Sequence, residues 1–336
     1  MAVDTEARAA AEVELALPWH EDLWAHMAGA LNGDRVAHGL LFCGPGGVGK
    51  RRFAERTVAA LLCRERDTQG EACGQCSGCR QRRAGTHPDI SRLVPDEPGK
   101  RIKVDQVRRF AHALHLTSQY DSGRVGWIDP ADALTVSAAN SLLKTLEEPP
   151  AGCHILLITD RLSSLLPTIR SRCQQWRIPA ASLDAARRWL ATRDIPVDQT
   201  PDDRLRAPLA VIGAHETGLA EQITQWDQDL SRLLARRANP VAVAERAAQA
   251  ERRPWVDWVY RRSADLLIAC VAAEQDSPLD ETATAAARRL GPVALQAWSR
   301  KVGAVAQNVE ANADWRLMLE SLFIDLSERV TEAGRT

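Results

Sequence analysis

The chain has 336 residues, of which 45% are apolar and 26% are charged, and its formal net charge is −1. This length suits two or three domains, and the near-neutral charge excludes a surface that is basic overall. The first residues carry acidic side chains and no run of about 18 apolar residues occurs, so we expect no signal peptide, no membrane anchor and a cytoplasmic location.

The first half of the chain has the pattern of a parallel α/β sheet, because short apolar strands alternate with helical segments. Strands are predicted at residues 38–43, 124–129 and 153–159. Helices are predicted from about Gly49, over residues 104–116 and over residues 137–148, where Pro149 and Pro150 end the last of them.

Beyond Pro179 the pattern becomes helical. Two short helices, at residues 183–190 and 205–212, predict a small helical domain, and longer helices follow, including 255–271 and 292–309. We expect the scattered tryptophans to pack between these helices. The predicted domains are therefore an α/β domain over 1–179, a small helical lid over 180–218 and an all-helical domain over 219–333.

A glycine-rich segment after the first strand fits the phosphate-binding pattern G-x-x-x-x-G-K. In this pattern backbone N–H groups surround phosphate oxygens, and the lysine reaches the terminal phosphates. The candidate nucleotide-contacting residues are Gly44, Gly46, Gly47, Val48, Gly49, Lys50 and Arg51. ATP or ADP could therefore bind, but Arg51 stands where a Ser or Thr would hold Mg²⁺, and a guanidinium cannot coordinate a cation. We do not expect Mg²⁺.

A second departure lies at the end of the strand at 124–129. Hydrolysing P-loop proteins place Asp and then Glu here, to serve Mg²⁺ and to orient the attacking water. In this chain Asp129 is followed by Pro130, which has no side-chain base. We therefore expect little ATP hydrolysis.

Four cysteines follow the P-loop helix with the spacing C-x9-C-x2-C-x2-C. Cys63, Cys73, Cys76 and Cys79 would be reduced in a cytoplasmic protein, and four thiolates suit a tetrahedral, structural Zn²⁺. We predict a zinc module over 63–79. An iron–sulfur cluster is a weaker alternative, because the following Cys-Pro of the ferredoxin pattern is absent.

These features together resemble the clamp-loader branch of the AAA+ ATPases, the γ/τ and δ′ subunits of bacterial DNA polymerase III. The resemblance rests on the P-loop at 44–50, the inserted cysteine module, SLLKTLEEPP at 141–150 and SRC at 171–173. It covers residues 18–179 and implies an AAA+ P-loop domain with an inserted zinc module, followed by a helical lid and an all-α C-terminal collar.

The resemblance also implies roles for single residues. Arg172 of SRC would project into a neighbouring subunit's nucleotide site as an arginine finger supplied in trans. Thr159 would be the sensor near the γ-phosphate. A chain that keeps Arg172 but departs at Arg51 and Pro130 matches the δ′ pattern.

The partners implied by this resemblance are γ/τ and δ subunits in a hetero-pentamer, the sliding clamp, and primer–template DNA through the assembled complex. The chain would be a component of the polymerase III holoenzyme with no polymerase activity of its own. Three alternatives stay open. The first is an ATP-hydrolysing γ-type subunit, and the second is a polymerase or exonuclease, for which no paired-carboxylate site is found. The third is a DNA-binding regulator that uses the zinc module, with local positive charge from Arg80, Arg82, Arg83, Lys100, Arg101 and Lys103.

Overall fold

The computed structural model describes residues 15–97, 99–119, 123–197, 200–272, 277, 279–309 and 314–334. The chain divides into two compact units, Met1–Ile212 and Gly213–Thr336. The division into three domains that the sequence suggests stays a prediction.

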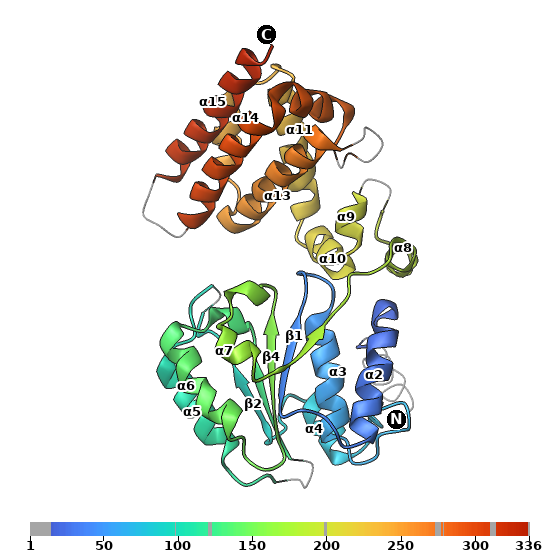
Figure 1. Cartoon of the computed structure of the whole chain (residues 1–336). Helices are drawn as coiled ribbons and strands as arrows, with labels where there is room; N and C mark the ends of the chain where they lie inside the picture. Colours follow the sequence, from blue (N-terminus) through green and yellow to red (C-terminus); the bar gives the residue numbers. More distant parts are fainter. Residues whose placement is uncertain are drawn as a thin grey trace. The chain divides into compact units, whose positions relative to one another are not determined.

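A five-stranded parallel sheet forms the centre of the first unit (Figure 1). Its strand order is β2-β3-β4-β1-β5, so β1 lies between β4 and β5. This arrangement confirms the predicted α/β class with a parallel sheet. The strands are β1 (Gly39–Cys43), β2 (Ile90–Leu93), β3 (Arg124–Ile128), β4 (Cys153–Thr159) and β5 (Gln174–Arg177).

Helices cover both faces of the sheet, because successive side chains of each strand point to opposite sides. Leu40 and Phe42 of β1 face a core shared with α2 and α3, whereas Leu41 faces a core shared with α5 and α6. Figure 1 shows these two helical layers with the strands between them. The helices are α2 (Glu21–Asn32), α3 (Lys50–Leu62), α5 (Val104–Leu114) and α6 (Val136–Glu147).

Shorter elements complete the first unit. Leu17 packs with α8 and α9 in a small separate core that includes Trp189 and Leu190. The predicted helix at 205–212 is instead two helices, and Pro208 opens the second, as its fixed φ favours at a first helical position. These elements are η1 (Pro18–His20), α4 (Ser77–Arg83), η2 (Ala131–Ala133), η3 (Leu162–Ser164), α7 (Pro167–Arg170), α8 (Leu183–Ala191), α9 (Asp202–Leu205) and the first part of α10 (Pro208–Glu216), up to Ile212.

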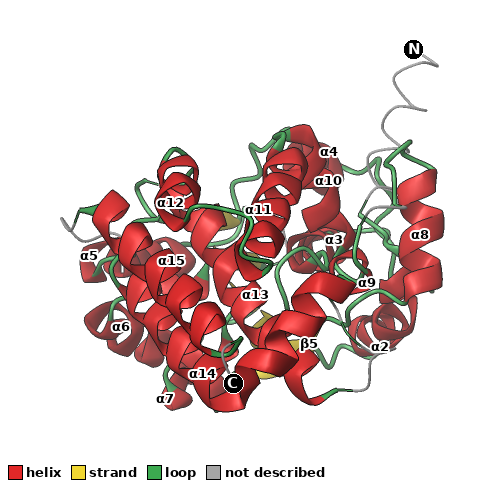
Figure 2. Cartoon of the chain, turned by 90° about the horizontal axis from the view of Figure 1, so that it is seen from above, coloured by secondary structure: helices red, strands yellow, loops and turns green. Residues whose placement is uncertain are grey.

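The second unit is a bundle of helices (Figure 2). Apolar side chains from these helices form one core. Trp255 and Trp298 are fully buried in it, which confirms that the tryptophans pack between helices. Gly291 has φ 73° and breaks α14 just before Pro292. The helices are α11 (Leu219–Leu234), α12 (Pro240–Ala248), α13 (Arg252–Val271), α14 (Glu281–Gln307) and α15 (Trp315–Glu332). None of the helices in the described part of the chain has the length and apolar character to span a bilayer.

Candidate functional site

The glycine-rich segment forms a loop between the end of β1 and the start of α3. Gly49 precedes the helix with φ 96°, a left-handed conformation that glycine adopts without strain. A Cβ at this position would lie 2.4 Å from Cδ1 of Leu17, so the close approach also requires glycine. The loop therefore has the backbone course of a P-loop, with the N-terminus of α3 directed at the loop.

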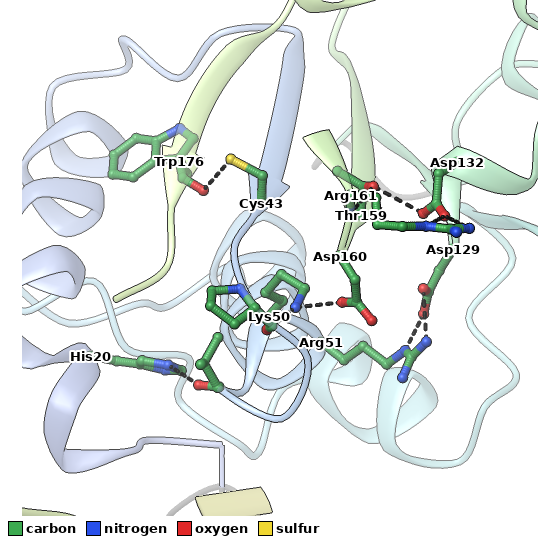
Figure 3. Close-up of polar contacts among 12 residues, drawn as sticks. His20, Cys43, Lys50, Arg51, Asp129, Asp132, Thr159, Asp160, Arg161 and Trp176 are labelled. Atoms are coloured by element: carbon green, nitrogen blue, oxygen red, sulfur yellow. Dashed lines mark hydrogen bonds and ion pairs between the residues drawn. The ribbon is translucent and has the colours of Figure 1, made fainter. Parts of the chain in front are cut away.

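The side chain of Lys50 contacts Asp160 and Pro45, which both belong to the first unit. Its Nζ lies 2.5 Å from Oδ1 of Asp160 and donates a hydrogen bond to the carbonyl oxygen of Pro45, also over 2.5 Å (Figure 3). The side chain of Lys50 is only 4% exposed, whereas that of Asp160 is 60% exposed. The ammonium group that would reach phosphate thus already faces a carboxylate.

Arg51 pairs with the carboxylate that would serve a metal. Its Nε donates to Oδ2 of Asp129 over 2.5 Å, and its Nη2 donates to Oδ1 over 3.1 Å. The hydrogen bond to Asp129 raises the pKa of Arg51 above its ordinary value. A bidentate guanidinium–carboxylate pair is among the stronger charge-assisted contacts. Asp129 therefore faces a fixed positive charge on the protein itself.

Thr159 belongs to a separate hydrogen-bond network at the end of β4, in which Thr159 and Asp132 are buried. Its hydroxyl donates to Oδ1 of Asp132 over 2.9 Å and accepts from the N–H of Arg161 over 3.0 Å. The guanidinium of Arg161 also donates to Oδ2 of Asp132, at 3.1 and 2.8 Å. Figure 3 shows this group beside the pair formed by Lys50 and Asp160. The predicted sensor role of Thr159 stays a prediction.

The beginning of α10 lies directly against the P-loop. The N–H of Leu209 donates to the carbonyl oxygen of Gly47 over 3.1 Å. A Cβ at Gly47 would lie 2.5 Å from the Cβ of Ala210. Glycine at this position thus allows the helix to contact the loop backbone.

The four cysteines predicted as metal ligands converge around the start of α4. The sulfur atoms of Cys63, Cys73, Cys76 and Cys79 all lie within 4.8 Å of one another. Tetrahedral Zn²⁺ with Zn–S bonds of about 2.3 Å requires sulfur separations of about 3.8 Å, so small adjustments would close the site. The arrangement could hold one zinc ion.

Backbone N–H groups already point at these sulfur atoms, as in a loop shaped for thiolates. The N–H groups of Glu65 and Cys73 lie 3.4 and 3.2 Å from the sulfur of Cys63. Burial, followed by the charge of Cys63, raises the pKa of Cys79. Burial also acts to raise the pKa of Cys76, but hydrogen bonds to its sulfur outweigh burial and lower that pKa to about 7. A bound cation would favour all four thiolates.

Arg172 lies on the turn between α7 and β5, away from the contacts of the P-loop. Its Nε and Nη2 lie 2.7 and 2.5 Å from Oε1 of Glu147, the last residue of α6. Its Nη1 donates to the carbonyl oxygen of Thr168 over 3.0 Å. The side chain is 34% exposed, so its guanidinium lies at the surface of the first unit.

Two of the three arginines of α4 border a hollow of about 330 Å³. Arg82, Arg83 and Arg92 line it, and so does Glu55, whose carboxylate lies 3.7 Å from Arg92. The hollow therefore contains both signs of charge.

The structure places the predicted site residues in four places: the P-loop with Asp129, the hydrogen-bond network of Thr159 at the end of β4, the cysteine cluster, and the surface position of Arg172. Sequence reasoning did not identify Asp160, Asp132 or Glu147 as their partners. Asp160 directly follows Thr159 at the carboxyl end of β4. Parallel strands place their carboxyl ends at one edge of the sheet, so this position could have predicted that Asp160 lies near the P-loop after β1.

A family model described as "DNA polymerase III, delta subunit" matches residues 19–182. A DNA polymerase III subunit delta′ of Pseudomonas aeruginosa is 40% identical over 235 residues, which are 67% of this chain and 70% of the relative. The protein of the same name from Escherichia coli is 34% identical over 211 residues, which are 62% of this chain and 61% of the relative.

Solved structures give a more distant likeness. A DNA polymerase III gamma subunit-related protein from Thermotoga maritima has 15% sequence identity and a TM-score of 0.43, and the match covers 90% of this chain and 99% of that chain.

Proposed function

Because this chain belongs to the DNA polymerase III subunit delta′ family, we propose that it is the δ′ subunit of a clamp loader. In this role it assembles with γ/τ and δ subunits into a hetero-pentamer and helps to load the sliding clamp on primed DNA. The contribution to DNA synthesis is indirect, and the chain itself has no polymerase activity.

We propose that the chain acts mainly as a structural subunit and hydrolyses little ATP. The pair formed by Arg51 and Asp129 carries this proposal, since Mg²⁺ in P-loop ATPases is held by a Ser or Thr and a strand-end Asp. Here an arginine replaces the hydroxyl and directs its guanidinium at that carboxylate. Pro130 supplies no base for water. The same pair argues against the alternative of an ATP-hydrolysing γ-type subunit.

Arg172 is proposed to act in a neighbouring subunit's nucleotide site. Its side chain lies at the surface, where a partner subunit could approach it, and it would exchange its contact with Glu147 for phosphate oxygens. Its planar fork matches phosphate oxygens, which is the chemistry of an arginine finger. We also propose that residues 180–218 form a small helical lid and that residues 219–333 form the collar through which the subunits assemble. The four cysteines are proposed to bind one structural Zn²⁺.

Reconstitution with γ/τ and δ subunits tests the proposal. We expect a stoichiometric complex whose DNA-dependent ATP turnover and clamp loading exceed those of the same mixture without this chain. The isolated chain should show neither activity. An isolated chain that hydrolyses ATP at the rate of the γ/τ subunit would favour the γ-type alternative.

A further inference from the structure

We infer that the hollow lined by Arg82, Arg83 and Arg92 binds an acidic peptide segment of a partner protein, in which an apolar side chain lies beside a carboxylate. These arginines belong neither to the P-loop nor to the turn that carries Arg172, so the inference goes beyond the proposed function. The composition of the hollow, the way in which the fold holds the arginines, and the size of the hollow support it.

The hollow has an excess of positive charge. Arg82 and Arg83 belong to the last turn of α4, and Arg92 belongs to β2. Among the described residues that line the hollow, Glu55 of α3 carries the one negative charge. Three guanidinium groups thus outnumber one carboxylate, so the hollow attracts an anionic group.

Arg92 is oriented by an aromatic ring. Arg92 of β2 and Trp127 of β3 are register partners, and Cζ of Arg92 lies 4.8 Å from the centre of the Trp127 ring. The nearest contact between Arg92 and Glu55 is 3.7 Å, which is longer than a hydrogen bond. Stacking leaves the in-plane N–H groups of a guanidinium able to donate. A carboxylate can therefore accept from Arg92 without breaking a hydrogen bond to Glu55.

The cysteine cluster positions the other two arginines. Helix α4 begins directly after Cys76, one of the four clustered cysteines. A Cβ at Gly78 would lie 2.6 Å from the carbonyl oxygen of Leu62, so glycine here lets the start of α4 pack closely against the end of α3. Arg82 and Arg83 therefore extend from a helix that is held at its base.

The size and lining of the hollow favour a peptide over a nucleic acid. A volume of about 330 Å³ accommodates a few side chains. Leu15 and Val58 add apolar surface, which a hydrocarbon side chain can cover but a phosphate group cannot. A nucleic acid strand carries a negative charge at every nucleotide, and the carboxylate of Glu55 would repel it. An Asp or Glu next to an apolar residue matches both parts of the lining.

The test measures the binding of short fluorescein-labelled peptides to the isolated full-length chain by fluorescence anisotropy. A peptide that alternates Asp with Leu should bind with a dissociation constant below about 1 mM. Replacing every Asp by Asn, or every Leu by Ser, should weaken binding at least about tenfold, because each change removes one part of the match. Oligodeoxythymidine of the same length should not displace the peptide.

Substitutions in the chain should change the affinity in opposite directions. Arg83→Met/Arg92→Met should weaken binding at least about tenfold, because methionine keeps an apolar stem and removes the charge. Glu55→Gln should strengthen binding, because it removes the repelling carboxylate. Arg108→Met/Arg187→Met is the matched control: both arginines form surface ion pairs outside the hollow, with exposures of 69% and 54%. This control should leave the affinity unchanged.

Four results would overturn the inference: equal affinity for the Asp and Asn peptides, an equal loss in the control variant, a Glu55→Gln affinity no higher than that of the wild type, or displacement of the peptide by oligodeoxythymidine. Circular dichroism checks that each variant is folded, and the gain expected in Glu55→Gln cannot arise from misfolding. Since these measurements use the isolated chain, their failure leaves the reconstitution test of the proposed function unaffected.

Discussion

The buried ring of His20 donates a hydrogen bond from Nε2 to the carbonyl oxygen of Val48 in the P-loop, over 2.8 Å. This donor role requires that the proton of the neutral ring lies on Nε2. Nδ1 has no hydrogen-bond partner among the described residues, so its protonation would bury a second N–H without an acceptor. Burial lowers the pKa of His20 from 6.5 to about 4.

The free energy of unfolding should therefore depend on the protonation of His20. The unfolded chain binds this proton below about pH 6.5, whereas the folded chain resists it until about pH 4. Stability is thus complete above pH 6.5 and falls by about 1.4 kcal/mol per pH unit below it, for a total of about 3 kcal/mol.

Urea denaturation between pH 4 and pH 8 checks this dependence. His20→Gln, whose amide can still donate to Val48, should show a shallower loss of stability between pH 6.5 and pH 4 than the wild type. Identical slopes for the two proteins would show that His20 is not the group responsible.

The first unit was predictable where the sequence pattern is regular. The P-loop, β1, β3 and β4 follow from glycine spacing and apolar runs, and the structure places them within a residue of the expected bounds. β2 and β5 were missed because they have four residues each and carry polar side chains, as in Arg92 and Gln174. Both strands lie at the edges of the sheet, and their sequences contain no apolar run that would predict a strand.

The partners of the site residues could not be predicted in the same way. The P-loop pattern identifies Lys50, but its contact with Asp160 depends on two strands, β1 and β4, lying side by side. The contact of Arg172 with Glu147 likewise joins the end of α6 to the turn before β5. Both are tertiary contacts between segments that are far apart in sequence, so only the fold reveals them.

Zinc binding is the next prediction. We expect about one Zn²⁺ per chain in freshly purified reduced protein, measured by inductively coupled plasma mass spectrometry, since four thiolates saturate a tetrahedral ion. Cys76→Ser should lower the zinc content and destabilise the region of α4. Cys270→Ser, a thiol of α13 outside the cluster, should leave the zinc content unchanged. Absence of metal, or iron in its place, would contradict a zinc site.

ATP hydrolysis by the isolated chain should be negligible. Arg51→Thr is the informative variant, because it restores a hydroxyl for Mg²⁺ but leaves Pro130 without a base. We expect phosphate release by both proteins to stay at the background of the assay. Turnover by the wild type at the level of an ordinary P-loop ATPase would refute this account of the pocket.

A buried ion-pair network should stabilise the second unit. The guanidinium of Arg262 lies 2.6 Å from Asp227 of α11 and 2.7 Å from Asp265 of α13, and Trp258 also donates to Asp227. Arg262→Met removes the cation that both carboxylates face, and we expect a loss of about 3–5 kcal/mol in the free energy of unfolding. Urea denaturation followed by circular dichroism measures this loss.

Arg316→Met provides the control for that variant. Arg316 pairs with Glu245 and Glu320 on the exposed surface of the same unit, where solvent screens the charges. Its replacement should have a far smaller effect than that of Arg262. Equal losses in the two variants would mean that the buried network adds nothing beyond surface pairing.

The central claim is that Arg172 acts in a neighbouring subunit, and steady-state ATP turnover of the reconstituted complex built with Arg172→Ala tests it most directly. The variant should fold and assemble, shown by circular dichroism and gel filtration, because the side chain lies at the surface. Turnover and clamp loading should fall partially, with one site silenced, and Arg172→Lys should restore little, since an ammonium lacks the planar fork. Wild-type turnover and loading by the assembled Arg172→Ala complex would contradict the claim.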